Sequence, residues 1–166
     1  QATLSDGARA RINTYLRNGG TILFDTRDQN LSGIGGVGPG TQTLRSLVGG
    51  LDIPALLEIP TTHVLTKAFY LLHEFPGRWE GGRLFVQKPD ERVNDGVSSV
   101  IIGANDFAAA WAIDATGRPM FSVVPGSARQ RELAFRFGVN LVMYALTGNY
   151  KADQVHVDEI LERLGQ

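Results

Sequence analysis

Three polar side chains that could do chemistry follow directly on a short apolar run. The run Thr21–Phe24 leads into Asp25, and Arg27 and Asp28 come next. A carboxylate at such a place can accept a proton, hold a metal ion or orient a sugar hydroxyl. In open α/β sheets, ligands bind beyond the carboxyl ends of the strands. Asp25, Arg27 and Asp28 are therefore the first candidate site residues, with the alternative that Asp25 caps loop N–H groups and Arg27 pairs with a neighbouring carboxylate.

His63 is the best catalytic candidate among the three histidines. Together with Asp25 it could transfer protons, and the same pair with Asp28 offers oxygen and imidazole ligands that suit several divalent metals. Nothing in the spacing demands an ion, so we predict no metal site. A structural histidine that hydrogen-bonds the backbone at a helix start is the alternative. A hydrolytic triad built on Ser98 or Ser99 is disfavoured because the chain has no Gly-x-Ser-x-Gly elbow.

A second polar and aromatic group lies on both sides of another run rich in β-branched residues, Val97–Gly103. Its members are Asn94, Asp95, Asn105, Asp106 and Trp111. We expect Asn105, Asp106 and Trp111 to line the same crevice and to bind ligand there. Turn chemistry explains the Asn and Asp residues nearly as well, and Trp111 could equally belong to the core.

Hydrophobic periodicity predicts the elements that must position these groups. A helix over Leu4–Arg17 with Ser5 as N-cap feeds a central parallel strand at Thr21–Phe24. The other predicted elements are strands at Arg83–Gln87, Val97–Gly103 and Met120–Val124, helices at Thr41–Leu47, Lys67–Leu71 and Ala128–Leu146, and a hairpin turn at Asp114–Pro119. Thr66 and Ser127 are the expected N-caps of the last two helices, and Ala108–Ile113 is ambiguous between helix and strand.

A glycine-rich stretch, Asn30–Gly40, separates the first site group from the next helix. It contains Gly33-x-Gly35-x-x-Gly38, formally a dinucleotide-binding fingerprint. That function requires the glycines to follow a strand at once and to open a helix. Here polar residues intervene, and Pro39 is expected to disturb the helix start. The stretch is therefore interpreted as a surface loop.

Composition excludes several classes of function. The chain has 166 residues, a net charge of −1 and no cysteine. A nucleic-acid partner is not expected without an excess of basic residues, and thiol chemistry is impossible. No apolar run reaches the roughly 18 residues that span a bilayer, so we expect no direct membrane insertion of this chain. No cofactor is indicated.

The chain divides into residues 1–150, one domain, and a tail, 151–166. The tail carries apolar residues at helical spacing: Val157, Ile160, Leu161 and Leu164. A helix of this kind either docks on the domain or presents its apolar stripe to a partner, and docking is favoured because termini are often tied down in this way.

Four segments in consistent order resemble a bacterial domain-of-unknown-function family. They are Tyr15–Asp25, Thr62–Thr66, Asn105–Trp111 and Arg136–Leu146. That family is placed in the class I glutamine-amidotransferase-like superfamily and is related to ThuA-like proteins. The resemblance implies a flavodoxin-like three-layer α/β sandwich with a mainly parallel sheet, truncated here at its N-terminus. It also implies that the domain belongs to a larger, membrane-anchored chain, with the membrane side undetermined.

The resemblance does not bring a reaction with it. Amidotransferases need a Cys nucleophile, so glutaminase activity is excluded, and Asp25 stands where ThuA-like relatives carry a His. The leading hypothesis is a non-catalytic or ligand-sensing domain of a bacterial membrane-associated protein. One alternative is a ThuA-like enzyme or carbohydrate-binding domain using Asp25 and His63, with or without a divalent metal. Another is an assembly module that pairs chains into a homo-oligomer.

Overall fold

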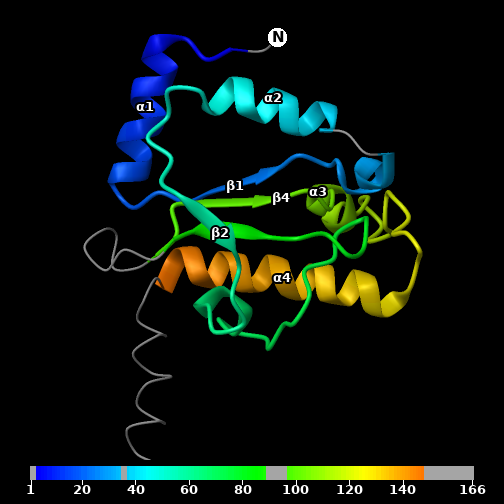
Figure 1. The fold of residues 1–166 in the computed structure, drawn as a ribbon. Helices are drawn as coiled ribbons and strands as arrows, with labels where there is room; N and C mark the ends of the chain where they lie inside the picture. Colours follow the sequence, from blue (N-terminus) through cyan, green and yellow to red (C-terminus); the bar gives the residue numbers. More distant parts are fainter. Residues whose placement is uncertain (1–2, 35–36, 89–96, 148–166) are drawn as a thin grey trace, which may run out of the picture.

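The fold is a three-layer arrangement of helices and one sheet, seen in a computed structural model that describes residues 3–34, 37–88 and 97–147. Helices α1 (Asp6–Arg17) and α2 (Pro39–Val48) cover one face of the sheet. The longest helix, α4 (Ala128–Thr147), covers the other face (Figure 1). A mixed α/β sandwich is thus confirmed.

In the described part of the chain, four strands form the sheet in the order β1 (Ile22–Asp25), β4 (Val100–Gly103), β3 (Phe85–Gln87) and β2 (Leu56–Glu58). Of these strands, β1 and β4 pair in parallel, from Ile22 opposite Val100 to Asp25 opposite Gly103. The β4–β3 and β3–β2 pairs are antiparallel. The predicted mainly parallel sheet is therefore wrong, because β3 enters between β4 and β2 in the opposite direction. The mixed strand directions remove the main support for a flavodoxin-like topology.

The strand that ends at Asp25 is an edge strand among the described residues, and the prediction of a central strand is wrong. Its apolar run resembled a strand buried on both faces, yet β1 is only half-buried along its length. The central position belongs to β4, where Val100 and Ile101 are both 0% exposed. A four-residue run is too short to separate these cases by periodicity.

The predicted N-caps of α1 and α4, Ser5 and Ser127, are confirmed. The Ser5 hydroxyl accepts a hydrogen bond from the Ala8 amide at 3.2 Å. The Ser127 hydroxyl accepts one from the Gln130 amide at 2.9 Å. For α2 the prediction was wrong at the start: Pro39 does not disturb this helix but occupies its first turn, where a missing N–H has no cost.

Several predictions for the connecting segments are wrong. A short 3₁₀ helix, Val64–Thr66, takes the place of the predicted helix at Lys67–Leu71, and His63 rather than Thr66 is its N-cap. Strand β2 lies inside a segment interpreted as a connection, and 120–124 forms a single bridge at Val124 instead of a strand. The ambiguous segment is helix α3 (Phe107–Trp111). Asn94, Asp95 and the predicted tail helix lie outside the described residues.

The core lies between α4 and the sheet. Phe137 and Tyr144 of α4 pack with Phe107, Val86 and Ile101, which are almost completely buried. Within this apolar layer the fully buried Asn140 makes four hydrogen bonds to the backbone of residues 65–70. Its Nδ2 donates to the carbonyls of Leu65 (2.9 Å) and Tyr70 (2.8 Å). Its Oδ1 accepts from the amides of Phe69 (3.2 Å) and Tyr70 (2.7 Å).

No helix in the described part of the chain is both long and apolar enough to cross a membrane.

Replacing Asn140 with Ala should lower the free energy of unfolding by about 3 kcal/mol or more, because four buried or partly buried backbone groups lose their partner. Urea denaturation measures this loss. Asn18→Ala is the matched control, since the Asn18 side chain is exposed at the end of α1, and it should change stability by less than about 0.5 kcal/mol. Equal effects of the two substitutions would contradict the role assigned to Asn140.

Candidate functional site

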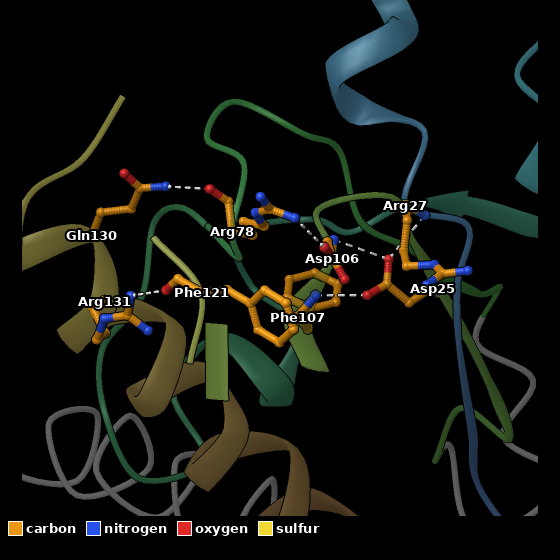
Figure 2. A network of polar contacts seen from close by, with 8 residues as sticks. All are labelled: Asp25, Arg27, Arg78, Asp106, Phe107, Phe121, Gln130 and Arg131. Atoms are coloured by element: carbon orange, nitrogen blue, oxygen red, sulfur yellow. Dashed lines mark hydrogen bonds and ion pairs between the residues drawn. The ribbon is translucent and has the colours of Figure 1, made fainter. Parts of the chain in front are cut away.

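The parallel pairing of β1 with β4 brings the two candidate polar groups together. Both strands end at the same edge of the sheet, so the Asp25 side chain reaches the loop that follows β4 (Figure 2). Its Oδ1 accepts a hydrogen bond from the Asp106 amide at 3.2 Å, and its Oδ2 accepts one from the Phe107 amide at 2.6 Å. Asp25 therefore caps the start of α3 from a different strand.

The same carboxylate supports two residues in unusual backbone conformations. Arg27 and Asp106 both adopt the left-handed region, with φ of 58° and 53°. For residues with a side chain this conformation costs roughly 1–2 kcal/mol. The Arg27 amide donates to Asp25 Oδ1 at 3.2 Å, and the Asp106 amide donates to the same atom. Non-glycine residues in this conformation tend to gather at functional sites.

The charge state of Asp25 reflects opposing influences. Burial raises the pKa of this carboxyl above its ordinary value, while the three amide hydrogen bonds oppose the rise, and the negative charge of Asp106 adds to it. Three amides occupy three of about four acceptor directions on the two oxygens. Asp25 thus has little capacity left for a ligand.

Asp28 plays a similar structural part at the start of α2. Its Oδ1 accepts from the Gly40 amide at 3.0 Å and its Oδ2 accepts from the Thr41 amide at 2.6 Å. Burial works against the charge of this carboxylate, but the hydrogen bonds from Thr41 and Gly40, with the nearby positive charge of Arg27, lower its pKa. An internal carboxylate therefore occupies the helix terminus that a dinucleotide phosphate would need.

The glycines of the fingerprint-like stretch have a packing role. A Cβ on Gly38 would lie 2.3 Å from Asp28 Cγ, and one on Gly40 would lie 1.9 Å from the Thr26 carbonyl oxygen. Glycine is required at both positions so that the loop after β1 can lie against the start of α2. Of the three fingerprint positions, Gly38 thus has a packing reason to be glycine.

A third loop, residues 76–82, completes this edge of the sheet. The Arg78 amide donates to the Asp106 carbonyl at 3.2 Å, and the Trp79 amide donates to the Asn105 carbonyl at 3.0 Å. From α4, the buried Gln130 side chain donates to the carbonyls of Arg78 (3.1 Å) and Val124 (3.0 Å) (Figure 2). The Arg78 backbone is therefore held on both sides.

The Arg78 guanidinium is the least committed polar group of the site. Its Cζ lies 5.0 Å from the Trp79 ring centre and 5.6 Å from that of Phe121, so aromatic rings contact the group. Its Nη1 lies 3.7 Å from Asp106 Oδ2, too far for a hydrogen bond. Among the described residues its buried Nε has no hydrogen-bond partner. With its side chain 34% exposed, the guanidinium remains accessible from this edge of the sheet.

These loops enclose a cleft of about 630 Å³ at the end of β1. Four of the candidate residues line it: Asp25, Arg27, Asp28 and Asp106. Its other lining residues come from the segments after β1, from α2 and from the third loop: Phe24, Thr26, Asn30, Leu31, Pro39, Gly40, Thr43, Leu44, Leu47, Arg78 and Trp79. The volume suits a small molecule.

Two of the residues predicted to bind ligand lie elsewhere. Asn105 is 1% exposed, and its Nδ2 donates to the Phe75 carbonyl at 2.7 Å. Trp111 donates from its indole nitrogen to the Ala134 carbonyl at 2.7 Å and packs beside Phe107. Neither side chain lines the cleft, so the structural alternative describes both.

His63 lies at the other end of β4 from Asp25. Its Nε2 is 3.4 Å from Ser98 Oγ, before the strand begins, whereas Asp25 pairs with the last residue of the strand, Gly103. At about 3.3 Å per residue, Ser98 and Gly103 are roughly 16 Å apart. The structure therefore does not bring Asp25 and His63 into one site. Within the described residues no three His, Asp or Glu side chains are grouped to hold a metal ion.

The hydrogen bonds of His63 and Ser98 fit a structural role and not a catalytic one. His63 Nδ1 accepts from the Leu65 amide at 3.2 Å, so the proton of the neutral ring is on Nε2. Nε2–H then donates to Ser98 Oγ, whose own hydroxyl donates to the Gln87 carbonyl at 3.4 Å. A histidine in this tautomer cannot accept the serine proton. Burial lowers the pKa of His63 to about 4, which keeps the ring neutral.

Arg78 and Trp79 are the site residues that sequence reasoning missed. They lie in an irregular stretch after Pro76 and Gly77, which does not directly follow any predicted strand. An adjacent cation and aromatic residue in a surface loop was the signal that could have indicated them.

The described residues thus form a mixed α/β domain with a ligand-sized cleft at the end of its parallel strand pair. Residues 1–146 match the model of a family described as Domain of unknown function (DUF4159), and the chain belongs to that family. No curated protein matches the chain significantly.

Asp25→Ala should lower the free energy of unfolding by about 2–4 kcal/mol, because three amides and the start of α3 lose their acceptor. Urea denaturation provides the measurement. Asp52→Ala is the control: the Asp52 carboxylate is 62% exposed and meets Arg17 at 3.5 Å, so its loss should change stability by less than about 1 kcal/mol. A similar loss in both variants would refute the capping role.

His63 should make the protein less stable in mild acid. The unfolded chain takes up a proton near the ordinary pKa of 6.5, whereas the folded ring resists protonation until about pH 4. Acid therefore favours the unfolded state in this window, by about 3 kcal/mol in total. The raised pKa of Asp25 acts in the opposite direction just above pH 3.8. The effect of His63 is therefore read as a difference between variants.

Chemical denaturation at a series of pH values isolates this effect. His63→Asn should remove the fall in stability between pH 6.5 and 4, while His73→Asn, which changes an exposed histidine, should retain it. An unchanged pH profile in His63→Asn would show that the ring is not held neutral by burial.

Proposed function

We propose that this is a non-catalytic, ligand-sensing domain whose strand-end cleft binds a small molecule through a carboxylate or phosphate group. The observation that carries the proposal is the Arg78 guanidinium, which lines the cleft with its side chain 34% exposed. Guanidinium groups bind such anions through two parallel hydrogen bonds.

The other charges of the cleft support anion binding. Arg27 is exposed on the same cleft and adds a second positive group. The carboxylates of Asp25 and Asp28 are engaged by backbone amides, which reduces their repulsion of an anion. Asp106, 3.7 Å from Arg78, could accept a hydrogen bond from a hydroxyl or amine of the ligand. We therefore expect a ligand that carries hydroxyl or amino groups besides its anionic group.

The resemblance to amidotransferase-like proteins extends this proposal to the larger protein that would contain this domain. A domain of that superfamily without a nucleophile would serve as a sensor in a bacterial membrane-associated protein. The zero cysteine count supports the loss of glutaminase chemistry. The enzyme alternative, a ThuA-like domain using Asp25 and His63, lacks support from geometry because the two side chains lie at opposite ends of β4.

Amide NMR titration with inorganic phosphate, citrate and glucose tests the proposal. Phosphate or citrate should shift the amide signals of Arg27, Trp79 and Asp106, because these backbone groups line the cleft. Arg78→Gln should weaken the effect roughly 10- to 100-fold, the value of one or two charge-assisted hydrogen bonds. Arg83→Gln is the control, since the Arg83 side chain is 70% exposed and pairs with Glu58 away from the cleft.

Three results would contradict anion sensing. These are no shift of the cleft amides with either anion, shifts with glucose alone, or equal weakening by Arg83→Gln. Arg78→Lys guards against a folding defect: it keeps the charge and should bind more weakly than wild type but better than Arg78→Gln. A thermal-shift screen with Mg²⁺, Mn²⁺, Ca²⁺ and Zn²⁺ addresses the enzyme alternative. Stabilisation by one ion that disappears in Asp25→Asn would favour that alternative.

A further inference from the structure

Helix α4 is apolar on two opposite faces. Ala134, Phe137 and Tyr144 face the core and are almost completely buried. On the far side a second stripe is exposed, which we call the outer stripe: Phe135 (40%), Val139 (40%), Val142 (56%) and Leu146 (78%). These positions recur at three- and four-residue spacing, so they form one continuous row. An amphipathic surface helix has a polar outward face, so this row is expected to be covered.

The place of α4 in the fold leaves the outer stripe free of the sheet. Figure 1 shows α4 as the layer opposite α1 and α2. Beside the first half of the helix the surface is hollowed into an open groove of about 860 Å³, whose lining includes Tyr70, Phe135 and Val139. The stripe therefore leads into a groove that a further segment could enter.

We propose that residues 148–166 of this same chain cover the outer stripe as an antiparallel helix. The sequence of this tail places Val157, Ile160, Leu161 and Leu164 on one helical face. From Asp153 to Leu164 such a helix spans about 16 Å, the same length as the outer stripe from Phe135 to Leu146. The apolar surfaces therefore match in extent.

The connection and the charges favour this occupant. Five residues, 148–152, separate α4 from the tail helix, and antiparallel helices are commonly joined by about two to five residues. The tail carries four acidic and two basic side chains, whereas α4 carries three arginines and one glutamate. A negative tail thus meets a positive helix. A tail on the same chain also has a high effective concentration at the stripe.

This antiparallel arrangement predicts which residues meet. Counting back from the connection, Val157 falls opposite Val142, Ile160 and Leu161 fall opposite Val139, and Leu164 falls opposite Phe135. Glu159 lies on the other side of the tail helix. The absence of native cysteine allows a direct test by engineered disulfides.

The test uses the full chain with Val139→Cys combined in turn with Ile160→Cys, Leu161→Cys or Glu159→Cys. A disulfide requires Cβ atoms about 3.5–4.5 Å apart, so Ile160→Cys or Leu161→Cys should form an intramolecular disulfide at least about tenfold faster than Glu159→Cys under mild oxidation. Val142→Cys with Val157→Cys repeats the test at a second position, in case a change at Val139 disturbs the fold. Non-reducing electrophoresis and mass spectrometry separate intramolecular from intermolecular products.

Two outcomes would overturn the proposal. If the predicted pairs close no faster than the Glu159→Cys pair at either position, the tail does not dock on this stripe. If the same pairs form disulfide-linked dimers at micromolar concentration instead, a second copy of the chain covers the stripe, which is the assembly role.

Discussion

The carboxylate of Asp25 is the interaction on which the cleft depends. It accepts hydrogen bonds from the amides of Arg27, Asp106 and Phe107, which belong to two loops almost eighty residues apart in the chain. The in-register parallel pairing of β1 with β4 makes this reach possible, because Asp25 lies opposite Gly103. Without an acceptor at this point, two left-handed residues and the start of α3 would have no local support. The shape of the cleft therefore follows from the register of one strand pair.

The distribution of unused hydrogen-bonding capacity favours binding over catalysis at this edge of the sheet. A general base needs a free lone pair directed at its substrate. Asp25 and Asp28 direct most of theirs at backbone amides, and the His63 tautomer donates at the nitrogen that would have to accept. The guanidinium of Arg78, by contrast, remains accessible from the cleft. Position after a strand end thus indicates where a ligand binds, while hydrogen-bond accounting indicates what the residues there can do.

The sequence predicted the features that depend on neighbouring residues. The caps Ser5 and Ser127, the strand before Asp25 and the meeting of Asp25 with Asp106 all follow from local pattern and the strand-end rule. Features that depend on distant pairing were not predictable. Strand β2 has three residues and is fixed by its pairing with β3, and the direction of β3 makes the sheet mixed. The Arg78 backbone is held in place by Asp106, Val124 and Gln130, which are all distant from it in the chain.

Helix α4 links these parts of the molecule. At one end the side chain of Gln130 binds the backbone of Arg78, and in the middle Asn140 binds residues 65–70. Both side chains are buried polar groups on the core face of α4, and each is satisfied by backbone partners. Such contacts fix position rather than add hydrophobic stabilisation.

A ligand that drew the Arg78 loop toward Arg27 would therefore act on α4 through Gln130. The same rigid helix carries the outer stripe, so the contacts made there by a covering segment and the contacts made in the cleft share one element. Two sites on one element are coupled when binding at one changes the binding equilibrium at the other. Under the two proposals, α4 is the element through which occupancy of the cleft would alter what binds on the outer stripe.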